Sequence, residues 1–104
     1  MDREIRLSKS AARNLDSILA FLEKKWSLKT KQTFILKLDH SLKLIQSHPD
    51  IYPESESITG LRKCVVTKQT TLFYKYSETT IYIISVFDTR QNPETLLKET
   101  TNLQ

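Results

Sequence analysis

The sequence has little glycine, little cysteine and no long apolar run. One glycine, Gly60, and three prolines in 104 residues leave no glycine-rich phosphate loop and no low-complexity linker. Cys64 is the only cysteine, which excludes an internal disulfide and is compatible with a reducing compartment. The charges of the first residues exclude the apolar core of a signal peptide, and no apolar run approaches the roughly 20 residues that span a bilayer. We therefore expect a cytoplasmic protein without a membrane segment.

The length and composition of the chain are those of one small domain. A chain of 104 residues with 38% apolar and 27% charged residues has room for one modest core, so we assign residues 1–104 to a single domain. The formal charge of +4 favours an acidic partner, either nucleic acid or a negatively charged protein, without choosing between them. His40 and His48 are eight residues apart and far from Cys64, so neither a metal site nor a cofactor is expected.

The first half of the chain has the pattern of a strand followed by two helices. Residues 2–7 alternate polar and apolar, which predicts a short strand with one buried face. Ser8 or Ser10 can cap a helix that continues to about residue 25, and Ser27 can cap a second that continues to about residue 47. Apolar residues at helical spacing predict the buried stripes: Ala12, Leu15, Ile18, Leu19, Leu22 and Trp26 in the first helix, and Phe34, Ile35, Leu38, Leu42 and Ile45 in the second.

The second half predicts three consecutive antiparallel strands. Residues 60–93 contain three runs rich in β-branched and aromatic residues, separated by polar turns such as residues 77–80. In the first run we expect Leu61 and Val65 to meet the helices, which leaves Arg62 and Lys68 on the open face of the sheet. The last run is apolar on both sides and is expected to be central, with one side formed by Tyr82, Ile84, Val86, Asp88 and Arg90.

The predicted fold is an α+β sandwich of two layers. An N-terminal strand, an antiparallel two-helix hairpin and a three-stranded antiparallel meander follow one another, with the helices packed on one face of the sheet. Leu96 and Leu97, after Pro93, are expected to form a final turn or short helix.

This order and four segments of the sequence resemble the RelE/ParE superfamily of bacterial toxins. The resemblance covers nearly the whole chain. Its segments are Ser8-Lys-Ser-Ala-Ala-Arg-Asn-Leu, Ile45-Gln-Ser-His-Pro, Leu61-Arg-Lys and the closing Val86-Phe-Asp-Thr-Arg-Gln-Asn-Pro93. It implies the toxin of a type II toxin-antitoxin (plasmid stabilization) system, which a cognate antitoxin neutralises in a hetero-oligomer. Such toxins inhibit growth by cutting mRNA on the ribosome or by poisoning DNA gyrase.

The resemblance also points to basic residues of the sheet. Arg90, just past the last strand, is the best single candidate, and the catalytic set of a nuclease would be Arg90, Arg62 and Lys68. The residues expected to bind the target or nucleic acid are Arg62, Lys63, Lys68, Lys75 and Arg90. The alternative interpretation is that these are solvated charges that prevent edge aggregation. We predict that Tyr74, Tyr76 and Tyr82 pack in the sheet rather than stack on bases.

The sequence departs from the nuclease pattern near its end. No tyrosine or histidine follows Tyr82, and the carboxylates Glu94 and Glu99 are expected to face solvent, so no residue is suited to general acid-base work. We therefore favour a ParE-like inhibitor that binds gyrase. Two alternatives stay open, namely a metal-independent, ribosome-dependent mRNA endonuclease and a degenerate toxin that acts only as a binding module.

Overall fold

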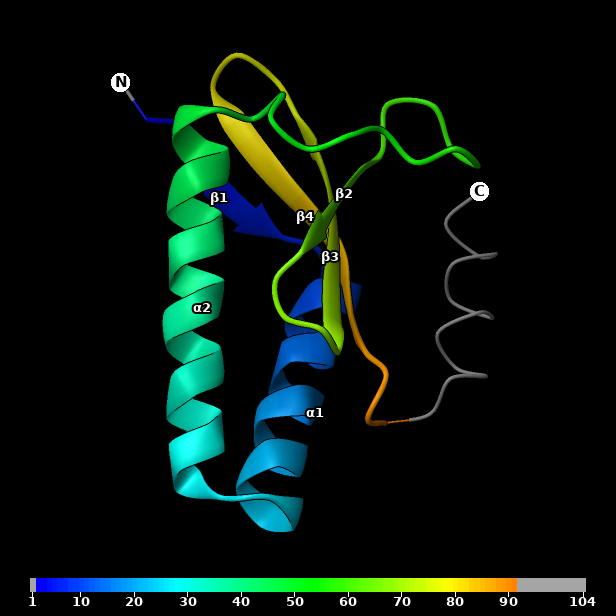
Figure 1. Ribbon diagram of the computed structural model, residues 1–104. Coiled ribbons are helices and arrows are strands. Elements are labelled where there is room, and N and C mark those ends of the chain that lie inside the picture. Colours follow the sequence, from blue (N-terminus) through cyan, green and yellow to red (C-terminus); the bar gives the residue numbers. More distant parts are fainter. Residues whose placement is uncertain (1, 92–104) are drawn as a thin grey trace.

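Two helices cover one face of a four-stranded mixed sheet in the computed structural model, which describes residues 2–91 (Figure 1). The sheet has the order β1-β4-β3-β2, with β1 parallel to β4 and the other pairs antiparallel. The elements are β1 (Glu4–Leu7), α1 (Lys9–Lys25), α2 (Leu28–Ser47), β2 (Arg62–Val65), β3 (Thr70–Tyr76) and β4 (Thr80–Asp88). The predicted α+β class and the central place of the last strand are confirmed. The expectations for Glu94, Leu96, Leu97 and Glu99 lie outside the described residues.

Serine caps fix where the two helices begin. The Ser8 hydroxyl accepts a hydrogen bond from the Ala11 amide at 2.9 Å, and the Ser27 hydroxyl accepts one from the Thr30 amide at 3.1 Å. Each bond satisfies an amide that has no partner within its helix. The cap of α1 is therefore Ser8 rather than Ser10, and the two helices form the predicted hairpin.

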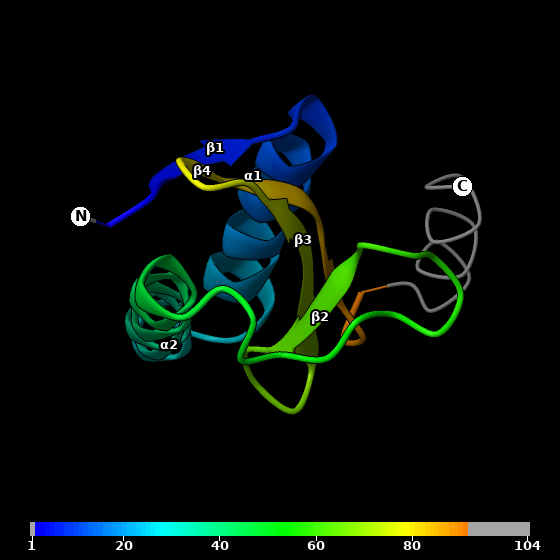
Figure 2. The same ribbon diagram turned by 90° about the horizontal axis from the view of Figure 1, so that it is seen from above.

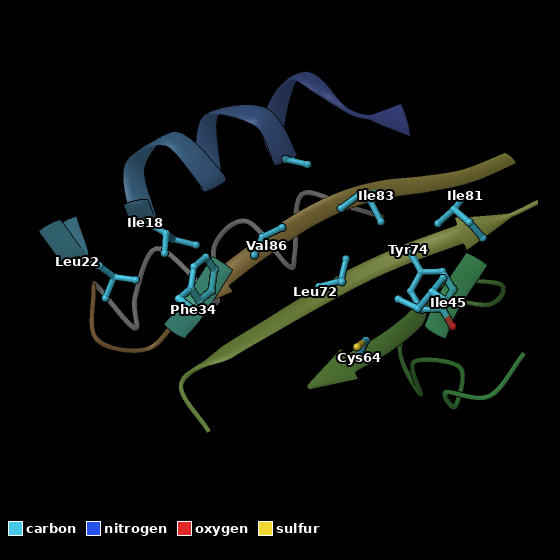
Figure 3. Close-up of a cluster of buried hydrophobic side chains, with 11 residues drawn as sticks. Ile18, Leu22, Phe34, Ile45, Cys64, Leu72, Tyr74, Ile81, Ile83 and Val86 are labelled. Atoms are coloured by element: carbon cyan, nitrogen blue, oxygen red, sulfur yellow. The ribbon is translucent and has the colours of Figure 1, made fainter. Parts of the chain in front are cut away.

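The main core lies between the helices and the sheet (Figures 2 and 3). Its buried residues are Ala11, Ile18, Leu22, Phe34, Ile45, Cys64, Leu72, Tyr74, Ile81, Ile83 and Val86. Three residues of the predicted stripes do not join it, since Trp26 is 58% exposed, Ile35 is 42% exposed, and Ala11 is buried in place of the half-buried Ala12. Trp26 leaves the stripe because it is the C-cap of α1 with non-helical backbone angles. Ile35 is rotated off the buried row of α2, on which Ser41 lies instead.

A β-bulge in β4 changes which of its side chains face the helices. Phe73 pairs with Ser85 and Tyr74 pairs with Ile83, so Ile84 has no direct partner on β3. The extra residue shifts the alternation by one position. Val86 therefore joins Ile83 in the main core, and Ile84 packs on a second cluster. The prediction that Tyr82, Ile84 and Val86 share one side is wrong for this reason.

The facing predicted for β2 is also wrong. Cys64 is fully buried in the main core, whereas Leu61 belongs to the second cluster, which also contains Phe73 and Phe87, and Val65 is 57% exposed. Lys63 pairs with Phe73, and Cys64 pairs with Leu72. Because successive residues of a strand point to opposite faces, Lys63 and Cys64 lie on opposite faces of the sheet. Because both faces carry an apolar cluster, alternation in the sequence could not decide which one meets the helices.

Helix α1 completes the half of β4 that β1 does not reach. The pairing of β1 with β4 ends at Leu7 and Ile83. Beyond it, the Ser8 hydroxyl donates to the Ile84 carbonyl at 2.6 Å, and the Val86 amide donates to Asn14 Oδ1 at 3.1 Å. Buried backbone groups need partners, and here the start of a helix supplies what a longer strand would.

Candidate functional site

The predicted basic residues do not form one patch. Arg62 on β2 pairs with Tyr74, close to the end of β3, whereas Arg90 follows Asp88, which pairs with Thr70 at the beginning of β3. The two arginines are therefore at opposite ends of the sheet. The three lysines are distributed between the open face and the β2–β3 turn.

Arg62 ties a loop to the sheet rather than lying on the open face. Its Nη1 donates to the carbonyl oxygens of Tyr52 at 2.5 Å and Asp50 at 3.2 Å, and its Nη2 is 3.9 Å from a carboxylate oxygen of Glu54. Its guanidinium also lies over the Tyr76 ring, 5.5 Å from the ring centroid. The expectation that Arg62 projects from the open face is wrong, because β2 presents that residue to the same side as Cys64.

The three tyrosines have different surroundings. Tyr74 packs in the core as predicted, where burial raises the pKa of its phenol to about 12 and its hydroxyl donates to the Pro49 carbonyl at 2.6 Å. Tyr76 is flanked by a second guanidinium, that of Arg3, at 5.6 Å from the ring centroid. Tyr82 is 42% exposed, so its ring is not enclosed in the sheet as predicted.

Arg90 is held in a bidentate pair with a buried carboxylate. Its Nε and Nη2 donate to the two oxygens of Asp88 at 2.9 and 2.6 Å, and its backbone amide donates to the same carboxylate at 2.9 Å. The Thr70 hydroxyl adds a fourth bond at 2.7 Å. Burial alone raises the pKa of Asp88, but the bonds from Arg90 and Thr70 outweigh it and lower that pKa. The bonds to Asp88 likewise raise the pKa of Arg90 against the effect of burial.

Arg90 also lines a cleft of about 270 Å³ between the first half of α2 and the β2–β3 turn. The lining residues are Lys29, Thr30, Thr33, Phe34, Lys37, Thr67, Gln69 and Arg90. Lys68 belongs to the same turn without lining the cleft. The lysines at 29 and 37 were not predicted as site residues, although their spacing of eight places them on one side of a helix. Only the tertiary fold brings that side against Arg90.

Lys63 and Lys75 lie on the open face, away from the helices. Lys63 pairs with Phe73 and Lys75 pairs with Tyr82, so both share this face with the second apolar cluster. A depression of about 440 Å³ beside Lys63 also contains two acidic side chains; its lining residues are Pro53, Glu54, Ser55, Glu56, Ser57, Lys63 and Phe73. The open face therefore offers charge of both signs around an apolar centre.

Comparison with known proteins identifies the family. Residues 5–93 match the family model described as ParE toxin of type II toxin-antitoxin system, parDE. The chain belongs to the ParE toxin family. No curated protein sequence matches it at a significant level.

Solved structures of other toxins have the same fold as this ParE-family chain. The chromosomal ParDE toxin-antitoxin system of P. aeruginosa aligns with a TM-score of 0.69 at 12% identity, over 83% of this chain and 95% of the other. The E. coli DinJ-YafQ complex aligns with a TM-score of 0.60 at 15% identity, over 89% of this chain and 99% of the other. The RelBE2 complex of Mycobacterium tuberculosis aligns with a TM-score of 0.58 at 15% identity, over 85% of this chain and 99% of the other. At these identities the likeness concerns the fold.

Other chemistry finds little support in the ParE-family chain. Burial raises the pKa of the Cys64 thiol, which disfavours the thiolate that a nucleophile needs. Within residues 2–91 the structure contains no group of three or more His, Cys, Asp or Glu side chains that could hold a metal ion. In the same range, no helix is long and apolar enough to cross a membrane.

Proposed function

We propose that this toxin stops growth by binding DNA gyrase rather than by cutting RNA. The observation that carries the proposal is the pairing of Arg90 with Asp88, together with the distance along the sheet from Arg90 to Arg62. A metal-independent nuclease needs several cations that converge on one phosphate and a group that transfers a proton. Arg90 is already neutralised by a carboxylate, and Arg62 is occupied by backbone carbonyls. A protein inhibitor needs only a complementary surface.

We further propose that a cognate antitoxin, encoded beside the toxin, neutralises it in the cytoplasm as a hetero-oligomer. The similar structures from P. aeruginosa and E. coli belong to toxin-antitoxin systems. The open face, with its apolar cluster and the lysines Lys63 and Lys75, is the surface that we assign to gyrase or to the antitoxin. Lys68, exposed in the β2–β3 turn, is a further basic residue that we assign to target binding.

A ribosome-dependent mRNA endonuclease is the second candidate. Its support is the direct pairing of Lys75 with the partly exposed Tyr82, because a cation beside an aromatic ring suits contact with RNA phosphates and bases. Arg90, Arg62 and Lys68 would then have to act from separate places. A degenerate toxin that only binds its antitoxin is the remaining alternative.

The proposal can be tested by inducing the full chain in a bacterium whose gyrase the toxin can bind, alone and together with the adjacent gene. We expect growth arrest with a DNA-damage response and intact messages, and rescue by the adjacent gene. Primer extension that finds codon-linked cuts without the damage response would contradict gyrase as the target. Arrest should weaken in the Lys63→Gln/Lys75→Gln variant. Lys43→Gln, which removes a lysine paired with Asp39 on the surface of α2, is the matched control and should arrest growth normally.

A further inference from the structure

We propose that the cleft between α2 and Arg90 binds the phosphodiester backbone of a single-stranded nucleic acid, with Trp26 as a stacking surface for an unpaired base. This inference goes beyond the proposed function, because it concerns a different surface from the open face. It does not depend on whether the cellular target is gyrase or the ribosome.

Two of the three cations that line the cleft, Lys29 and Lys37, are not used by the fold. Lys29 and Lys37 have no ion-pair partner among residues 2–91, and within this range no carboxylate lines the cleft. By contrast, Lys31 is paired with Glu23 and Lys43 with Asp39, each at 3.0 Å. The two lysines of α2 that line this cleft therefore carry unpaired charges. Charges of one sign without a nearby counter-charge favour an anionic ligand.

Arg90 adds a fixed donor on the opposite wall. Its Nε and Nη2 bond to Asp88, and Nη1 takes part in none of the hydrogen bonds of the described residues. The carboxylate fixes the guanidinium plane, so the remaining N–H groups hold a constant direction. One arginine oriented in this way together with two unpaired lysines suits a phosphate, which presents several acceptor oxygens.

The neutral side chains of the cleft also suit a phosphate group. Thr33 and Gln69 line it with a hydroxyl and an amide. Such groups commonly bind the phosphate and sugar oxygens of nucleic acids, where they position the strand without reading its sequence. The cleft volume of about 270 Å³ admits a phosphate group and its adjoining sugar more readily than a bulky folded ligand.

Trp26 distinguishes a nucleic acid from an acidic peptide. The Arg90 guanidinium lies over the indole at 5.6 Å from the ring centroid, and Trp26 is 58% exposed at the end of α1. Arg90 therefore both lines the cleft and contacts an accessible indole. An unpaired base can stack on an aromatic ring while its phosphate reaches nearby cations, which is how proteins bind single strands without sequence preference. A carboxylate-rich peptide would use the cations and leave the indole without a role.

Fluorescence anisotropy of labelled oligonucleotides with the full chain, made by cell-free synthesis, tests this site. We expect binding of single-stranded RNA and DNA of one sequence, with affinity that falls as salt rises. Lys29→Gln/Lys37→Gln should weaken binding about tenfold and reduce the slope of log affinity against log salt by about 1.4, the effect of two lost phosphate contacts. Trp26→Ala should weaken binding to the single strand about tenfold and leave binding to a duplex unchanged.

The matched control is Lys31→Gln/Lys43→Gln, which removes the same charge from the same helix at paired positions. We expect its affinity to equal that of the wild type. An equal loss in both double variants would overturn the site in favour of general surface charge. Absence of oligonucleotide binding at low salt, or stronger binding of a glutamate-rich peptide than of the oligonucleotide, would also overturn it. None of these results depends on growth arrest, so failure here is distinct from failure of the gyrase proposal.

Discussion

Asp88 is the residue on which the end of β4 depends. Its side chain is fully buried and accepts bonds from the Thr70 hydroxyl, the Arg90 amide and the Arg90 guanidinium. Loss of one partner from a buried pair is far more costly than the pair's net contribution, because the other charge loses its compensation.

Asp88→Asn is therefore expected to destabilise the protein by about 3 kcal/mol, at the lower end for buried pairs because the Arg90 side chain keeps 14% of its exposure. Urea denaturation at neutral pH measures this loss. Asp39→Asn is the control, since it removes a carboxylate from an exposed pair and should cost less than about 0.5 kcal/mol. Equal losses in the two variants would show that the buried pair has no special role.

The same pair predicts a dependence of stability on pH. An aspartate in the unfolded chain has a pKa of about 3.9, and the pKa of Asp88 is lowered in the folded protein. Its contribution to stability is complete above the unfolded pKa and is lost as the pH falls toward the folded one. The difference in unfolding free energy between the wild type and Asp88→Asn should thus stay constant from about pH 7 to about pH 5 and shrink as the pH falls further toward about pH 3. A difference that stays constant down to about pH 3 would contradict the assignment of this shift to Asp88.

The sequence could predict the position of Arg90 but not its partner. A basic residue after the last strand follows from the resemblance, whereas its return to a carboxylate two residues earlier depends on the turn that the chain makes there. Lys29 and Lys37 illustrate the same limit. Helical spacing places them on one side of α2, but only packing decides that Arg90 faces them.

At the scale of elements, periodicity predicted the helices and strands well and the faces of the strands poorly. Serine caps and apolar spacing are local signals, so α1 and α2 begin and end close to the predicted residues. The bulge at Ile84 and the facing of Cys64 depend on pairing with residues far along the chain. With apolar residues on both faces of the sheet, the alternation has no unique solution.

The two caps predict unequal effects of the same substitution. Ser27→Ala removes a cap and an exposed hydrogen bond with the Thr30 hydroxyl, and it should cost about 1 kcal/mol. Ser8→Ala removes a cap and also the donor to the Ile84 carbonyl at the bulge, so we expect a loss of about 2 kcal/mol. Thermal or urea unfolding of the two variants measures both values. If Ser27→Ala is as costly as Ser8→Ala, the hydroxyl of Ser8 does not support the bulge.

For the whole molecule, β4 is the central element. It pairs with β1 on one side and β3 on the other, it packs under α1, and its side chains enter both apolar clusters. This centrality was predictable from its apolar character on both sides. The two surfaces proposed for function lie around it, the open face on one side of the sheet and the cleft near its end.

Stability should accordingly be distributed unevenly, and native-state hydrogen exchange can measure this. Amides at residues 81–86 of β4 are expected to exchange only through global unfolding, whereas those of the edge strand β2 should exchange through local opening with weaker dependence on denaturant. Asn14→Ala should speed exchange of the Val86 amide, because it removes the acceptor that α1 supplies. Protection of β2 equal to that of β4 would contradict this order, since it would mean that the edge opens only when the whole sheet does.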